Sequence, residues 1–553
     1  MKKIKKLLFL MLITTIVLSG CYGGTNDTSK TEDKDTTADS DSESLHLAMT
    51  GEIPTLKTNG EMDGLSATII QNIFEGLYRK GKDDDPIEGL VKDYEKNDEE
   101  TIYTFKLRED AKWSNGDPIT SHDFVYAWKK ALHPDTFSPH ADLMEPLKNA
   151  AKIQDPDDEM YGNVDELGVE AIDDYTLEVT LDSAVPYLFE LLTNPVYYPQ
   201  NEEFVTEQGD DYALEVDNLI FNGPYKLTKW DHDQGWVLEK NEDYWDAEEV
   251  KTNKIDFKVV KDTATEVNLY ESDTIDVANL SSDFIDEYND SDDYVTAIQS
   301  EMYFLRLNQK NEDLQNVNIR RALDMAYDKK EMSESVLKNG SIPAYFLIPP
   351  EFPEFESPSG EDFRDKYGDL NNESVEKAQE YFQKGLDELG KEEISLELLS
   401  YDDDQRKTVA EYIKNQWESN LPGLKITINQ QPNKQKLSLE GNLDYDISHS
   451  GWRSDVGDPV DFLTIFLSDG PYNWQNFENE EYDKLVKKAQ TDFSDNEIRF
   501  EELQEAEKIL IKEEVAISPM HVAGSAKLIE SYVQDFIAHG DSTYTYKWVE
   551  IKK

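Results

Sequence analysis

Hydrophobic and polar side chains alternate in two short stretches of this chain. Residues 102–110 carry Tyr103, Phe105 and Leu107 with polar residues between them, and residues 175–181 repeat the pattern. A period of two is typical of a strand that buries one face and exposes the other. Both stretches are therefore predicted to be half-buried strands.

Other stretches space their apolar side chains three and four positions apart, as an α-helix does. Residues 120–132 show this spacing, and Thr120 followed by Asp123 predicts a capped start for that helix. Residues 316–340 and 499–513 are predicted to be helices for the same reason. The chain has no repeat of fixed length, so its irregular mixture of strands and helices indicates an α/β or α+β fold.

The N-terminal end has a pattern of its own. Lysines precede an apolar stretch at residues 7–18, which is shorter than the about 20 residues that a membrane-spanning helix needs. Residues 1–20 are therefore predicted to be a secretory signal peptide. Cys21 is the only cysteine of the chain, and the sequence LSGC resembles the lipobox of bacterial lipoproteins. The resemblance implies a lipid on Cys21; the alternative is an incidental cysteine after a signal peptide.

Residues 21–44 are predicted to be a flexible tether, because they contain almost no apolar side chains and cannot collapse. As a random coil they would hold the folded part about 25 Å from the anchor. Since no later segment has the apolar length of a membrane span, we expect the protein on the outer face of the cell membrane. The remaining roughly 500 residues exceed one ordinary core and predict two or three lobes.

The chain is strongly acidic: 55 Lys and Arg residues stand against 117 Asp and Glu residues, for a formal net charge of −62. Nucleic acid is not expected as a partner, because phosphate binding needs a cationic surface. A field of this sign concentrates cationic ligands, and adaptation to salt is a second explanation for it. The 29 Tyr, 22 Phe and 9 Trp residues indicate a folded core all the same.

The motifs of common enzymes are missing from the sequence. Residues 76–83 imitate a phosphate-binding loop but carry Asp83 where a hydroxyl is needed, and an acid there would repel phosphate. Carboxylate pairs are unspecific in so acidic a chain. A metal site built from the distant His140, His449 and His521 stays open, but neither an enzyme nor a cofactor is predicted.

A resemblance to a known family begins at residues 103–132, which read YTFKLREDAKWSNGDPITSHDFVYAWKKAL. This segment resembles the signature segment of the family 5 extracellular solute-binding proteins, the oligopeptide-, dipeptide- and nickel-binding receptors of ABC importers. Length and opening motif favour the oligopeptide branch. Further segments resemble the family at residues 72–79, 222–230, 238–246, 316–330 and 342–350.

The resemblance implies an α/β, two-lobed periplasmic-binding-protein-like fold, in which crossover strands join the lobes and hinge closure encloses the ligand. It also implies an extra subdomain inserted in the first lobe. The expected division is 45–75, 202–302 and 520–553 for lobe I, 76–201 for the inserted subdomain and 303–519 for lobe II.

The segment HSGWRSDVGDP at residues 449–459 is where the resemblance places the ligand. In oligopeptide receptors this segment supplies a strand edge, here Gly451, Trp452 and Arg453, and an aspartate, here Asp455, that accepts the peptide α-ammonium. Main-chain pairing holds an extended peptide whatever its sequence, and one desolvated carboxylate reads the amine. The alternative for Asp455 is the capping of a turn before Gly-Asp-Pro.

The opposite edge of the ligand site is expected from GEMDGLS, at Met62, Asp63 and Gly64, which could also be an ordinary surface turn. His140 falls where relatives often carry a tyrosine that contacts the peptide backbone. His449 falls where some relatives carry an arginine. Arg406 lies near a position that neutralises the peptide carboxylate in some relatives, although a solvated helix start would explain it equally well.

The sequence therefore predicts a monomeric, lipid-anchored receptor that captures oligopeptides between two lobes and delivers them to the permease of an ABC importer. Within the same fold, the alternative is a receptor for a signalling peptide or another solute, such as a dipeptide or a metal chelate. An extracellular hydrolase and a surface adhesin or chaperone are alternatives from other classes.

Overall fold

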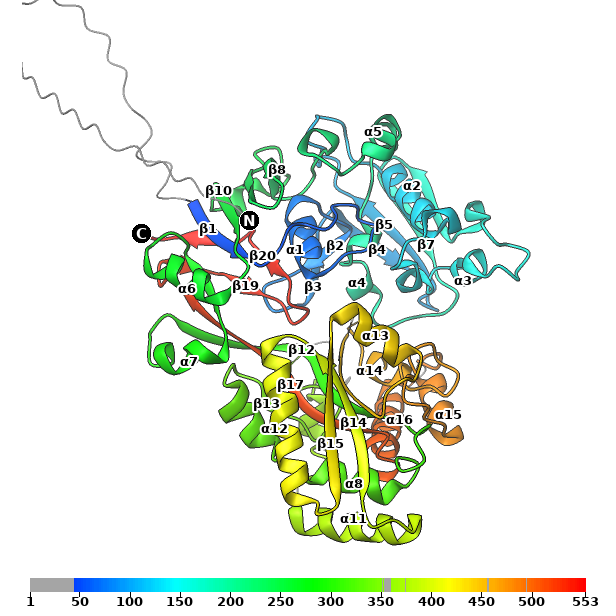
Figure 1. Cartoon of the computed structure of the whole chain (residues 1–553). Helices are drawn as coiled ribbons and strands as arrows, with labels where there is room; N and C mark the ends of the chain where they lie inside the picture. The colour runs from blue at the N-terminus through cyan, green and yellow to red at the C-terminus, as the bar shows by residue number, and fades with distance from the viewer. Residues whose placement is uncertain (1–43, 351, 353–359, 373, 455–456, 494) are drawn as a thin grey trace, which may run out of the picture. The chain divides into compact units, whose positions relative to one another are not determined.

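The computed structural model of the protein describes residues 44–350, 352, 360–372, 374–454, 457–493 and 495–553 (Figure 1). In these residues the largest sheet has eleven strands, in the order β15-β14-β16-β12-β17-β11-β1-β10-β9-β8, with β13 paired to β17. The strands are β1 (Ser44–Met49), β8 (Tyr225–Asp231), β9 (Gly235–Lys240), β10 (Lys254–Val259), β11 (Val277–Leu280), β12 (Tyr294–Leu307), β13 (Ile342–Pro343), β14 (Ile394–Tyr401), β15 (Leu424–Gln431), β16 (Ile447–Arg453) and β17 (Ile517–Ile529).

Two long antiparallel strands, β12 and β17, connect the two halves of this sheet. Toward one end β17 pairs with β11, and toward the other end β12 pairs with β16. The pairing of β12 with β17 shifts register between Ile298 and Met302, so the ladder is interrupted in mid-strand. The expected lobe boundaries at 302/303 and 519/520 fall within these two strands, as they must if the strands cross between lobes.

The first half carries a small second sheet of four strands in the order β4-β5-β7-β6. The predicted strands are confirmed as β5 (Ile102–Leu107) and β7 (Thr176–Thr180), next to β4 (Val91–Lys96) and β6 (Val169–Asp173). The predicted helix is α2 (Ser121–Leu132), and its capping box joins Thr120 to Asp123, as expected. Desolvation raises the pKa of the Asp123 carboxyl to about 6.

The second half differs from the sequence prediction in one helix. Residues 316–340 form α8 (Val317–Met325), α9 (Lys329–Glu331) and a π-helical turn (Met332–Leu337) instead of one continuous helix. Asp328 causes the break, since its side chain accepts a hydrogen bond from the backbone of Glu331 and starts a new helix. The helix predicted at 499–513 begins earlier, as α16 (Asn496–Lys508), and ends in a π-helical turn (Ile509–Glu513).

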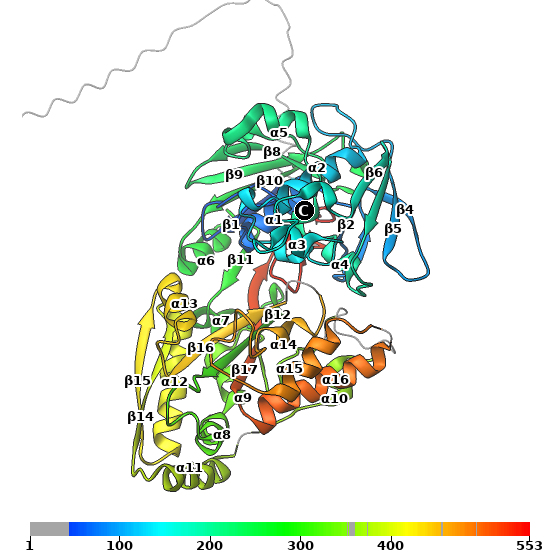
Figure 2. The same ribbon diagram turned by 90° about the vertical axis from the view of Figure 1, so that its right-hand side faces the viewer.

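Helices cover both faces of the second half of the sheet (Figure 2). α12 (Asp404–Asn420) packs against β14 and β15, whereas α15 (Glu480–Ala489) packs against α16. The other helices are α1 (Gly64–Ile73), α3 (Ala150–Gln154), α4 (Leu188–Leu191), α5 (Glu202–Gln208), α6 (Thr263–Glu271), α7 (Ser282–Tyr288), α10 (Phe363–Tyr367), α11 (Val375–Leu389), α13 (Asn433–Gly441) and α14 (Asp461–Thr464). The remaining strands are β2 (Tyr78–Lys80), β3 (Pro86–Glu88), β18 (Val533–Gln534), β19 (Ile537–Ala538), β20 (Tyr544–Thr545) and β21 (Glu550–Ile551).

The largest hydrophobic cluster runs without interruption from the expected inserted subdomain into lobe I. Two further clusters fill the second half, one on the α16 side and one on the α12 side of the sheet. Residues 76–201, the expected insertion, therefore share one hydrophobic core with the rest of the first half. Of the helices in the described ranges, none combines the length and the apolar character needed to cross a membrane.

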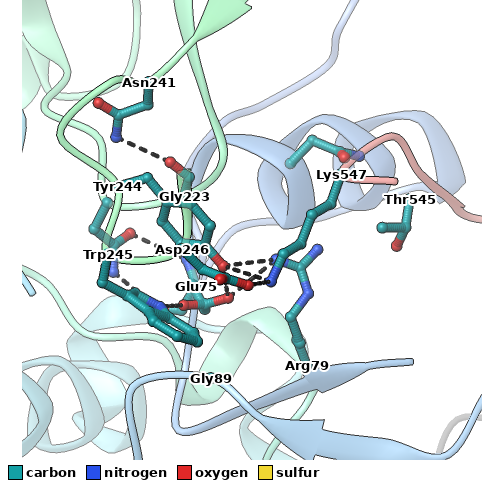
Figure 3. A network of polar contacts seen from close by, with 12 residues as sticks. Glu75, Arg79, Gly89, Gly223, Asn241, Tyr244, Trp245, Asp246, Thr545 and Lys547 are labelled. Atoms are coloured by element: carbon teal, nitrogen blue, oxygen red, sulfur yellow. Dashed lines mark hydrogen bonds and ion pairs between the residues drawn. The ribbon is translucent and has the colours of Figure 1, made fainter. Parts of the chain in front are cut away.

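A buried polar network, here called the Glu75 network, joins three distant segments of the first half (Figure 3). The Glu75 carboxylate accepts hydrogen bonds from Arg79 Nη1 at 3.0 Å, the Tyr244 hydroxyl at 2.5 Å and Trp245 Nε1 at 2.5 Å. Lys547 lies 2.6 Å from Asp246 and donates to the Tyr244 hydroxyl. The family-like segments 72–79 and 238–246 therefore meet around one buried carboxylate.

Candidate functional site

The predicted strand edge lies at the end of β16. Along one side β16 pairs with β12, from Ile447 opposite Leu307 to Arg453 opposite Glu301. Along the other side β14 pairs only with Ile447 and Ser448. Among the described strands, nothing covers this side of β16 beyond Ser448, so the half-buried residues 451–453 keep a free main-chain edge.

The three edge residues have different surroundings. A Cβ atom on Gly451 would lie 3.0 Å from Tyr303 Cε1, so glycine lets this ring lie close to the strand. Trp452 Nε1 donates to Asp461 Oδ2 at 3.3 Å, and Arg453 Nη1 donates to the carbonyl of Asp541 at 2.9 Å. Arg453 therefore ties the end of β16 to the C-terminal segment of the first half.

Asp455, the predicted partner of the peptide amine, lies outside the described residues. Its neighbour Ser454 donates its backbone N–H to the carbonyl of Ser300 at 3.4 Å. Buried Asp458, four residues after Ser454, pairs with Arg499 at 2.6 Å. The Gly-Asp-Pro segment is thus anchored by Asp458, and the role of Asp455 stays a prediction.

The predicted opposite edge lies at the start of α1. Asp63 is the N-cap of this helix, and its side chain accepts a hydrogen bond from the backbone of Ser66 at 2.8 Å. Met62 packs against the large core, and no atom lies within 4 Å of a Cβ built on Gly64. Asp63 therefore has a structural task, while Gly64 faces open space.

A cavity of about 60 Å³, here called the Asp541 cavity, is lined by residues from both halves, among them Gln71, Lys80, Ser454 and Asp541. Lys80 pairs with Asp541 at 2.6 Å. Burial raises the pKa of this carboxyl, but the charges of Lys80 and His539 and two hydrogen bonds outweigh it and hold the pKa well below its usual range.

A second cavity, of about 90 Å³, lies beside β12, β16, β17 and α12 and is here called the histidine cavity. Its polar lining includes Tyr303, Asn339, Ser341, Arg406, His449 and His521. Three buried nitrogens of this lining, Arg406 Nε, His449 Nε2 and His521 Nδ1, have no hydrogen-bond partner among the described residues. Buried donors and acceptors are seldom left without a partner unless a ligand or water completes them.

The guanidinium of Arg406 is held in place by two neighbours. Its Nη2 donates to the Tyr303 hydroxyl at 2.5 Å, and its Nη1 donates to Asp403 Oδ2 at 3.1 Å. Asp403 also caps the start of α12 through the backbone of Arg406. At the start of α12, both Nη atoms of Arg406 therefore contact protein groups, and its Nε has no partner among the described residues.

Positive charge dominates the interior next to the histidine cavity. Lys436 lies 2.6 Å and Arg306 lies 3.5 Å from the one carboxylate of Glu440, and all three side chains are buried. Burial lowers the pKa of Lys436 to about 8, although Glu440 opposes this shift. Two cations thus share one anion, so an additional anion in the cavity would be stabilised.

Both histidines of the cavity are neutral in this environment. Burial, followed by the charge of Arg406, lowers the pKa of His521 to about 3. Burial is also the largest cause for His449. Together with the charges of Arg406, His521 and Lys436, it holds the pKa of His449 well below its usual range. A neutral ring presents one donor and one acceptor, so either ring can offer an N–H to an anion.

The structure brings His449 and Arg406 together but places His140 in the inserted segment, before the turn Ala141–Met144. No group of three His, Cys, Asp or Glu side chains with metal-binding geometry occurs in the described part of the chain, so the trio of His140, His449 and His521 does not assemble there. The sequence analysis did not single out Tyr303 or Lys436, because no pattern of neighbouring residues indicates that these side chains lie near the histidines.

Comparison with known proteins gives a consistent result. The family model described as "Bacterial extracellular solute-binding proteins, family 5 Middle" matches residues 85–474. The dipeptide-binding protein DppE of Bacillus subtilis (strain 168) is 32% identical over 100% of both chains. The substrate-binding domain of an oligopeptide ABC transporter from Bacillus anthracis str. Ames is 40% identical, with a TM-score of 0.79, over 92% of this chain and 99% of that chain. Listeria monocytogenes OppA bound to peptide is 37% identical, with a TM-score of 0.78, over 92% and 99%. These matches confirm the predicted two-lobed α/β fold.

Proposed function

This chain belongs to the bacterial extracellular solute-binding proteins of family 5, and we propose that it is a receptor that captures oligopeptides between its two lobes for import by an ABC transporter. The observation that carries the proposal is the free main-chain edge of β16 at residues 451–453. An extended peptide that pairs with this edge is held by backbone hydrogen bonds, which tolerate any side chain. The similar proteins are named for binding dipeptides and oligopeptides, which supports the same ligand class.

The two ends of the peptide have separate partners in this proposal. Asp455 accepts the α-ammonium, at the end of β16. Arg406, with its unpartnered Nε in the histidine cavity, receives the carboxylate. Gly64 and its neighbours line the other side of the bound peptide. No step of this function needs catalysis or a cofactor, and the protein acts as a monomer that hands its peptide to membrane permease subunits.

We also propose that the receptor is lipidated on Cys21 and held at the outer face of the cell membrane. One acyl chain anchors a protein marginally and two anchor it stably, so at least two are expected on Cys21. Intact-mass measurement of protein extracted from membranes tests this: an unmodified cysteine contradicts the anchor, and Cys21→Ala should release the protein.

The test of peptide binding is calorimetry on a double cycle. Asp455→Ala should weaken binding by about 2–5 kcal/mol, because truncation strands a buried ammonium. N-acetylation of the peptide should produce a similar loss on the wild type and little further loss on the variant. Additive losses, or a drop in the unliganded variant's stability with unchanged affinity, would show that Asp455 only caps its turn.

A census of copurifying ligands by native mass spectrometry separates the remaining alternatives. A ladder of mixed peptides is expected from a nutritional receptor, and one species would indicate a receptor tuned to a signalling peptide or another solute. Incubation with a peptide library should return intact peptides. Cleavage of the peptides would show that the protein is a hydrolase and not a receptor.

A further inference from the structure

The histidine cavity contains an arrangement that the proposed function does not use. His449 on β16 and His521 on β17 lie on either side of Tyr303, with ring centroids 5.7 Å and 4.9 Å from the tyrosine ring. Each histidine has one ring nitrogen without a partner among the described residues, and both line the same cavity. The pair therefore offers two titratable groups at the place where a carboxylate would enter.

We propose that carboxylate binding in this cavity is coupled to the uptake of a proton by His449 or His521, so that the receptor binds more tightly as the pH falls. The inference rests on the proposed function, since it concerns the carboxylate of a bound peptide. The carboxylate can come from the C-terminus or from an acidic side chain, and the two sources share the same chemistry.

Burial and the charged groups around the two rings explain why the empty site holds no proton there. Desolvation is the largest cause for both rings, and the positive charge of Arg406 on α12 acts on both. Lys436 on α13 and His521 act in addition on His449. Tyr303 on β12 and Tyr401 on β14 stay protonated because burial raises their pKa values. Glu301 lies beside Tyr303, and Glu440 is already shared by Lys436 and Arg306. Burial and repulsion together therefore keep both rings neutral until an anion arrives.

A bound carboxylate reverses this balance. An opposite charge within about 4–6 Å favours the protonated imidazole and raises its pKa by roughly 1–3 units. The empty site binds fewer protons than the occupied site, so binding takes up protons and the association constant increases with decreasing pH. One fully linked proton gives at most a tenfold change per pH unit.

The size of the cavity fits such a ligand. One water molecule needs about 10–15 Å³ of such volume, so about 90 Å³ admits a carboxylate with little more around it. Asn339 lines the same space, and its Nδ2 donates one hydrogen to the Gly524 carbonyl at 2.7 Å, which leaves its second N–H for the anion.

Calorimetry of the wild-type protein tests the proposal without any variant. Short alanine peptides with a free carboxyl end and with a C-terminal amide are titrated in two buffers of different ionisation enthalpy, and the difference gives the protons taken up. Between about pH 7.5 and about pH 4.5 the affinity of the free acid should rise with proton uptake, by roughly fourfold if the carboxylate raises the pKa of His521 by about two units. The amide peptide has the same amine and therefore corrects for titration at the α-ammonium.

Two further arms identify the proton's place and the carboxylate's source. The variant with His449→Gln and His521→Gln keeps polar side chains of similar length but cannot be charged, so its proton uptake should disappear; His122→Gln, at an exposed histidine of α2, is the matched control. Peptide amides with glutamate in place of glutamine should regain the pH dependence if an acidic side chain enters the cavity.

The outcomes separate this inference from the proposed function. Acid and amide peptides that bind equally, or proton uptake that persists in the double glutamine variant, overturn the inference and leave a peptide receptor. If no peptide binds at any pH, the proposed function itself fails.

Discussion

The Glu75 network and the histidine cavity are both buried polar clusters, but they differ in how their charges are satisfied. In the Glu75 network three donors occupy the two oxygens of one carboxylate. Arg79 Nε lacks a hydrogen-bond partner, yet its guanidinium lies over the Trp548 ring. In the histidine cavity three nitrogens of the lining side chains have no partner among the described residues. A cluster whose carboxylate is fully satisfied supports a fold, whereas a cluster with several unpartnered nitrogens around one cavity keeps binding capacity for a ligand.

The largest effect is expected from Glu75→Gln, which would remove the charge that compensates buried Arg79. The free energy of unfolding should fall by about 3–5 kcal/mol, because an unpaired charge remains in the core. Denaturant unfolding measures the loss, and adding Arg79→Met should recover part of it. If Glu75→Gln instead weakens peptide binding in a protein of normal stability, the network is not structural and the comparison breaks down.

The next largest effect is expected from Arg406→Gln, on the other side of the comparison. Affinity for a peptide with a free carboxylate should fall by about 2–5 kcal/mol, because the anion loses its charged partner. The free energy of unfolding should change by less than about 1 kcal/mol, since the pair with Asp403 is partly exposed (34% and 41%). Calorimetry with the C-terminal amide is the control, and an equal loss for acid and amide would contradict the assignment.

A steric change can sharpen the link between the strand edge and the histidine cavity. Gly451→Ala would place a methyl group 3.0 Å from the Tyr303 ring, which positions Arg406. Affinity should fall by about 1–3 kcal/mol through overpacking. Gly51→Ala is the matched control, because nothing lies within 4 Å of its added Cβ and it is no part of the proposed site. If Gly64→Ala leaves the stability of the unliganded protein unchanged but lowers its affinity, the added methyl group contacts the bound peptide.

The smallest effect is expected at Asp541, which is paired like Glu75 but lines a cavity like Arg406. Its pKa is held below the usual range, so its contribution to stability is present above the ordinary carboxyl pKa and disappears as pH falls through the depressed value. Asp541→Asn should therefore lose about 1 kcal/mol near neutral pH and lose less as the solution becomes more acidic. Thermal melting across the acid range measures this; a loss that is independent of pH would argue against the Lys80 pair.

Predictions from short-range patterns succeeded where the contacts that decide a structure are close in sequence. The capping box of Thr120 and Asp123 spans three positions, and its hydrogen bonds form as predicted. The continuous helix at 316–340 was wrong because apolar spacing was followed past Asp328, whose cap for α9 is also a local signal. The uncovered edge of β16 was expected from family resemblance, but its extent depends on where β14 ends.

By itself, the sequence determined the family and the main strands and helices, because periodicity, caps and family motifs are properties of neighbouring residues. Only the tertiary structure decided which polar groups are satisfied. Glu75 receives its donors from Tyr244 and Trp245, and His449 meets His521 and Arg406 from separate elements. Whether a buried donor has a partner depends on groups that are distant in sequence, and a pattern of neighbouring residues does not show which of them come together in space.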